Sequence, residues 1–146
     1  MIFRTVTVTP KHGKFTIALK EPCKCRIALF DIILPCINQR AKPNNAIQIQ
    51  CEQIDQTFHN PDRLLKRIYF DRLAVTNSSH FWEAKILEFQ EINSSERFLE
   101  FTIQRLSGFP VKFHRNTTDH RVFLTFAIEL LDDDEHEFNN DKWACL

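Results

Sequence analysis

The alternation of apolar and polar positions between residues 97 and 131 predicts three β-strands in close succession. Residues 97–104 form the first segment, and a Ser-Gly-Phe-Pro corner at residues 107–110 ends it. A short segment at residues 111–113 and a longer one at residues 121–131 follow. No apolar period of 3.6 residues interrupts the stretch, so we expect strands rather than a helix here.

Four earlier segments also read as strands, and turn residues separate them. The first alternates and ends at Pro10, which is typical of an edge strand, while the third is long, apolar and closed by Pro35. In the fourth, Ile47, Ile49 and Cys51 face opposite to the alternating Ala46, Gln48, Gln50 and Glu52. The four segments are residues 5–9, 14–20, 25–34 and 46–54.

Two further segments leave their type open. Residues 63–70 fit a short helix or a strand, and residues 81–89 have the spacing of an amphipathic helix but lie between polar loops of strand-fold length, so we interpret them as a strand. The whole pattern predicts an all-β fold: one antiparallel β-sandwich or jelly roll of about eight strands. We place this domain at residues 1–131 and a short, acidic, flexible tail at residues 132–146.

The composition fits one domain of 146 residues and is rich in phenylalanine, with 14 Phe against one Tyr and two Trp. Because neighbouring strand residues face opposite sides, Phe98 and Phe101 are divided between core and surface, as are Phe123 and Phe126. An apolar outer face implies a partner. The chain has only two glycines, which excludes the glycine-rich phosphate-binding loops.

The formal net charge is zero, but residues 132–146 hold six acidic side chains against one lysine and leave a basic body. No basic arm suggests direct nucleic-acid binding. Phe138 and Trp143 lie within the acidic tail, which is either a solubilising terminus or a short motif that docks on a neighbour. No signal peptide and no membrane-length apolar run is visible, so we expect a protein that is not secreted and has no membrane partner.

Candidate chemistry is sparse, and we expect no enzyme, no cofactor, no bound metal and no small-molecule substrate. Cys23 and Cys25 lack the second cysteine or histidine pair of a structural zinc site, so free thiols are favoured. The chain has neither a nucleophile elbow nor a paired-carboxylate motif. The six histidines are scattered through predicted loops, and chance accounts best for the glycosylation sequons at Asn77, Asn93 and Asn116.

Five short motifs carry a family resemblance. Their order resembles that of small structural proteins encoded by Polinton/Maverick elements and by adintovirus-like or adomavirus-like DNA viruses. The resemblance implies a viral or transposon-derived virion component, a single jelly roll of penton or minor-capsid type. The chain departs from that pattern at residues 115–120, where no glycine precedes the last strand. The motifs are residues 26–38, 47–51, 64–68, 98–113 and 122–126.

These observations lead to two hypotheses. The first is a capsid subunit that associates with itself or with other virion proteins, in a virion assembled in the host cytoplasm or nucleus. The second is an intracellular β-sandwich module that captures a partner protein along an exposed edge strand. We expect the partner-binding residues to be Val6 and Val8 on the first strand, with Phe138 and Trp143 in the tail.

Overall fold

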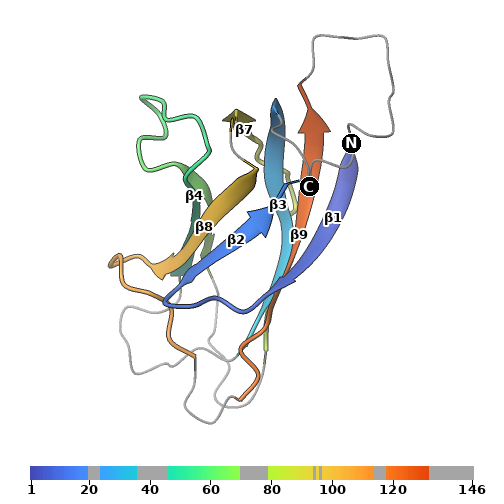
Figure 1. Cartoon of the computed structure of the whole chain (residues 1–146). Coiled ribbons are helices and arrows are strands. Elements are labelled where there is room, and N and C mark those ends of the chain that lie inside the picture. Colours follow the sequence, from blue (N-terminus) through green and yellow to red (C-terminus); the bar gives the residue numbers. More distant parts are fainter. Residues whose placement is uncertain are drawn as a thin grey trace.

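The computed structural model describes residues 1–19, 24–35, 46–69, 79–93, 95, 97–113 and 118–131. Within these residues the chain forms nine strands and no helix. The strands make two antiparallel sheets that pack face to face as two layers (Figure 1). The predicted all-β, antiparallel sandwich is therefore confirmed.

Each sheet draws strands from both halves of the chain. The first sheet has the order β1 (Ile2–Val8), β9 (Val122–Leu130), β3 (Lys24–Leu34), β6 (His80–Glu83), with β7 (Gln90–Asn93) also paired to β3. The second sheet has the order β2 (Lys14–Ala18), β8 (Phe98–Arg105), β4 (Ala46–Cys51), β5 (Leu64–Tyr69). Along the chain, β1 to β4 therefore alternate between the two sheets.

The strand pairs are nested along the sequence. The outermost pair is β1 with β9, and inside it lie β2 with β8, β3 with β6 and β7, and finally β4 with β5. The chain thus resembles one long antiparallel hairpin whose two arms are wrapped into two layers. Two further pairings, β3 with β9 and β4 with β8, join neighbouring turns of this wrapped hairpin into complete sheets.

The core lies between the sheets and follows the period of two. Ile47, Ile49 and Cys51 on β4 are buried, as the alternating pattern predicted. Three rings join the layers: Phe101 stacks on Phe15 at 5.0 Å between centroids, and on Phe126 of the first sheet at 5.3 Å. Such ring pairs add roughly 0.5–1.5 kcal/mol each beyond the area that they bury.

The segment at residues 81–89 is not the single strand that we predicted. Only its first residues belong to a strand, β6, and residues 84–89 form a connection. The next strand, β7, begins at Gln90. The strands β6 and β7 pair with the two ends of β3 and leave the middle of β3 to β9 alone. A β-bulge between Leu29 and Asp31 shifts the register at that point. Because six residues separate β6 from β7 and only three on β3 lie opposite, the excess chain leaves the ladder.

The strand pairing also decides three other predictions. The ambiguous segment at residues 63–70 is a strand, β5. The expected strand at residues 111–113 is wrong, since the described residues around it form only isolated bridges, at Phe113 and between Gln104 and Pro110. Pro110 has no N–H to donate, so it cannot extend a ladder. The strand expected at residues 46–54 ends at Cys51, and Ile54 forms only an isolated bridge with Ile92.

Candidate interaction surfaces

The outer face of the first sheet carries a row of apolar side chains across its strands. The registers align Phe123 of β9 with Ile33 of β3, and Ile33 with Phe81 of β6. Ile33 is 38% exposed and Phe81 59% exposed. On β1, Thr7 pairs with Phe123 and ends the row. An apolar strip thus runs across β9, β3 and β6.

Two more rings enlarge this surface toward the start of β1. Phe3 is 51% exposed and meets Phe30 edge to face, with the ring centroids 5.1 Å apart. The bulge in β3 places Phe30 beside the register break. We call the surface formed by Phe3, Phe30, Ile33, Phe81 and Phe123 the aromatic face.

Polar side chains also lie on this sheet, between and beyond the apolar groups. Thr5 and Thr125 are hydrogen-bonded to each other through their hydroxyls at 3.0 Å. Arg26 and Glu129 form an ion pair across β3 and β9, and Arg26 also lies over the ring of Phe89 at 5.1 Å. These pairs lie between and beside the apolar side chains, so polar groups interrupt the aromatic face.

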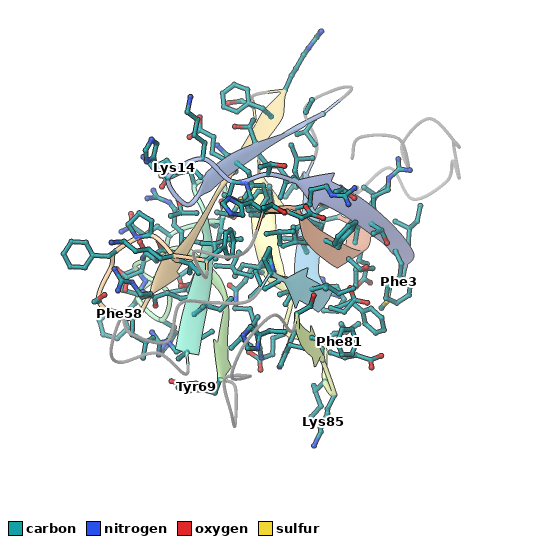
Figure 2. All side chains as sticks on the ribbon, turned by 90° about the horizontal axis from the view of Figure 1, so that it is seen from below. Phe3, Lys14, Phe58, Tyr69, Phe81 and Lys85 are labelled. Atoms are coloured by element: carbon teal, nitrogen blue, oxygen red, sulfur yellow. The ribbon has the colours of Figure 1, made fainter. Side chains whose placement is uncertain are left out.

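The outer face of the second sheet is polar and hydrogen-bonded to itself. Gln104 donates to Gln50 at 2.9 Å, and Arg67 donates to Gln48 at 3.3 Å. We call this surface, made by Gln48, Gln50, Arg67 and Gln104, the glutamine face. At its edge, Tyr69 is 61% exposed. In Figure 2, Phe3 and Phe81 lie on the side of the first sheet, and Tyr69 lies on the side of the second.

The predicted edge strand is at an edge. Among the described strands, β1 pairs with β9 alone. Val6 and Val8 pack against the core, so a partner added at this edge would meet the backbone of β1 rather than these two side chains. Phe138 and Trp143, the other predicted partner-binding residues, lie outside the described residues.

A cavity of about 330 Å³ lies where the β1–β2 connection meets the segment that follows β8. We call it the turn pocket. Its apolar lining comes from Pro10, Ile103, Val111 and Phe113, and its polar lining from His12, Lys112 and His120, with Gly13 between them. The ring of His120 lies 5.2 Å from that of Phe113.

An ion pair lies beside the turn pocket and fixes part of the charge around it. Asp119 and Arg121, which flank His120, form an exposed ion pair at 2.9 Å. Hydrogen bonds from the Arg121 side chain are the main reason why the pKa of Asp119 falls to about 2. The carboxylate of Asp119 is thus paired with Arg121. Lys112 adds a positive charge to the pocket, and neither of its neighbours in the sequence is acidic.

The predicted free thiols are confirmed at two positions. Cys25 and Cys51 are free and buried, while Cys23, Cys36 and Cys145 lie outside the described residues. Burial raises the pKa of Cys51 to about 12, and burial lowers the pKa of His80 below its usual 6.5. Over the described part of the chain, no three His, Cys, Asp or Glu side chains come together as metal ligands.

Comparison with known proteins found no match for the chain. No family model matches it, and neither a curated protein nor a solved structure does. In the described ranges, no helix is long and apolar enough to cross a membrane. The surfaces themselves must therefore carry the functional argument.

Sequence reasoning missed two of these features. The row across β9, β3 and β6 could not be predicted, because the pairing of β3 with β6 depends on where β6 ends within the segment at residues 81–89. The turn pocket was missed because its walls come from residues 10–13, 103 and 111–120, which only the nested topology brings together. The available signal was the partition of phenylalanines between strand faces, which predicted that either Phe123 or Phe126 faces outward.

Proposed function

We propose that this chain is a non-enzymatic structural subunit of a virus-like shell, a jelly roll of penton or minor-capsid type. In this role it associates with copies of itself or with other virion proteins, in particles assembled in the host cytoplasm or nucleus. The jelly-roll assignment draws on the nested pairing, because two layers wrapped from one long antiparallel hairpin have the two Greek keys of that fold.

The single observation that carries the proposal is the aromatic face. Phe3, Ile33 and Phe81 are exposed on the outer side of a sheet whose inner side already supplies the core. Exposed apolar side chains that gather on one face are typical of protein–protein contact sites. Aromatic residues are also enriched at the centres of such interfaces.

The proposal is tested on the purified full-length protein. Sedimentation velocity over a wide concentration range, with negative-stain imaging of the most concentrated sample, should show closed rings or shells that grow in number with concentration. A protein that stays monomeric throughout, alone and mixed with structural proteins encoded by the same element, would contradict the proposal.

A second candidate is supported by the edge position of β1. A strand that pairs on one side only can accept a partner's strand through its free backbone groups. Val8→Pro, at the last residue of β1, tests this alternative. Loss of a captured partner protein with unchanged thermal stability and unchanged assembly would favour the binding module, whereas loss of assembly would favour the shell subunit.

A further inference from the structure

Backbone contacts fix one wall of the turn pocket. The N–H of Ile103 donates to the carbonyl of Gly13 at 2.7 Å, and Gly13 has a φ of +77°. A Cβ atom at Gly13 would lie 2.7 Å from the Ile103 oxygen, so only glycine permits this approach. On the other side, the N–H of Arg105 donates to Phe109 at 2.8 Å and fixes the corner. The wall of the pocket at Gly13 and Ile103 is therefore preformed.

Its size and chemistry define the ligand. About 330 Å³ is at the lower end of the range of roughly 300–1,000 Å³ that small-ligand sites occupy, which suits one aromatic side chain. Apolar walls from Ile103 and Phe113 favour a ring, and Lys112 and two histidines favour carboxylates beside that ring. The complementary ligand is an aromatic residue within an acidic peptide.

We propose that the turn pocket binds an aromatic side chain from the acidic segment 132–146 of a neighbouring copy. This inference rests on the proposed function, because it names a contact through which the subunits would assemble. The segment carries six acidic residues and two aromatic ones, Phe138 and Trp143. It therefore supplies both features that the pocket selects, and its negative charge opposes the basic remainder of the chain.

For Phe138, distance favours the neighbouring copy over the same one. His120 lines the pocket just before β9 begins, whereas Leu131 follows the other end of β9 and donates to the carbonyl of Lys24. The nine residues of β9 span about 30 Å. Phe138 is seven residues beyond Leu131 and reaches at most about 25 Å, which is too short for a return within one copy. Trp143 is twelve residues beyond Leu131 and reaches at most about 43 Å, so for this ring the dilution series below decides between the copies. A second copy placed end to end needs no such return path, and this head-to-tail contact can close into a ring.

The direct test is a peptide titration. The receptor is the full-length Trp143→Ala variant, so that its own segment lacks the ring, and the probe is a fluorescein-labelled peptide of residues 132–146. Fluorescence anisotropy should show saturable binding. Lys112→Glu in the receptor should weaken binding at least about tenfold. The matched reversal Lys85→Glu, at an exposed lysine of the β6–β7 connection, should change it less than about twofold.

Three outcomes would overturn the inference: no binding, equal binding to the Lys112→Glu and Lys85→Glu receptors, or undiminished binding of a peptide in which Phe138 and Trp143 are alanine. None of them depends on whether the chain forms shells. If the peptide binds as expected while the wild-type protein stays monomeric, the proposed function fails and the pocket assignment stands. If the wild type assembles and the peptide does not bind, the pocket assignment fails and the proposed function stands.

A dilution series decides which copy supplies the ring. In a Trp82→Phe variant, Trp143 is the sole tryptophan, so its emission reports whether the indole is buried. Emission that shifts from blue to red on dilution, together with dissociation in sedimentation, supports docking on a neighbour. Blue emission that is independent of concentration would mean docking within one copy and would contradict the proposal.

Discussion

The inner faces of the two sheets are similar in composition, but their outer faces differ. Both direct apolar side chains inward, such as Leu124 on β9 and Ile103 on β8. Outward, the first sheet presents Phe81 and its neighbours on the aromatic face, and the second presents glutamines that hydrogen-bond to one another. A sheet that faces water on one side normally alternates apolar with polar residues, as the second sheet does.

This difference separates the requirements of folding from those of the proposed assembly. Either outer face is compatible with the same core, since the inner residues alone join the layers. The rings of the aromatic face therefore add exposed apolar area without adding to the core. We interpret that area as contact surface, and the following predictions test how far the shared core and the contrasting faces are independent.

The largest effect is expected in the shared core. Phe101→Ala removes the central ring of the stack with Phe15 and Phe126 and should lower the free energy of unfolding by about 3–5 kcal/mol. Phe98→Ala, on the opposite side of the same strand and half-buried, should cost clearly less. Urea unfolding followed by circular dichroism and by tryptophan fluorescence should give one coincident transition. Separate transitions would mean that the sheets do not share one core.

The next effect concerns the turn that passes from the first sheet to the second. Gly13→Ala should lower the free energy of unfolding by about 3 kcal/mol, because positive φ and the close Ile103 carbonyl act together. Gly108→Ala should cost only about 1 kcal/mol, since Gly108 has positive φ but open space around its Cα. Thermal unfolding of the two variants checks the difference. Equal losses would show that strain alone, and not the close approach, matters at Gly13.

On the inner face of the second sheet, Cys51 should limit stability in alkali. Its pKa is raised from 9.0 to about 12 by burial, so above pH 9 the unfolded chain loses this proton and the folded chain keeps it. Stability should then fall by at most about 1.4 kcal/mol per pH unit. Urea unfolding at pH 8 and pH 10 should show a smaller fall for Cys51→Ala than for the wild type. An identical fall in both proteins would contradict this assignment.

On the inner face of the first sheet, His80 should limit stability in acid. It is only 5% exposed, and burial lowers its pKa below 6.5, so the folded chain favours the neutral ring. The stabilisation is present above pH 6.5 and is lost as pH falls through the pKa of the folded state. His80→Gln should reduce the loss of stability between pH 7.5 and pH 5.5 in chemical unfolding. If the loss is unchanged, another group is responsible.

The sequence pattern predicted most of the strands because alternation and turn residues act locally. The long apolar segment closed by Pro35 was interpreted correctly as a buried strand, β3, and the opening alternation as the edge strand β1. The partition of rings was also predictable from the period of two: Phe101 and Phe126 are buried, and Phe98 and Phe123 are not.

What could not be predicted depends on contacts between distant residues. The break between β6 and β7 lies opposite the bulge in β3, some 50 residues earlier in the chain. The pairing that aligns Ile33 with Phe81 has no local signal either. The turn pocket needs both sheets in place before Gly13 meets Ile103. These features follow from topology, which the order of short strands does not determine.

The most direct test of the central claim compares two exposed aromatic residues at matched positions. Phe81 on edge strand β6 is 59% exposed on the aromatic face, and Tyr69 on edge strand β5 is 61% exposed beside the glutamine face. Sedimentation velocity should show that Phe81→Glu raises the concentration needed for assembly at least about thirtyfold, which corresponds to about 2 kcal/mol. Tyr69→Glu should leave that concentration unchanged. Equal effects of the two substitutions, or no effect of Phe81→Glu, would contradict the assignment of the aromatic face as the assembly surface.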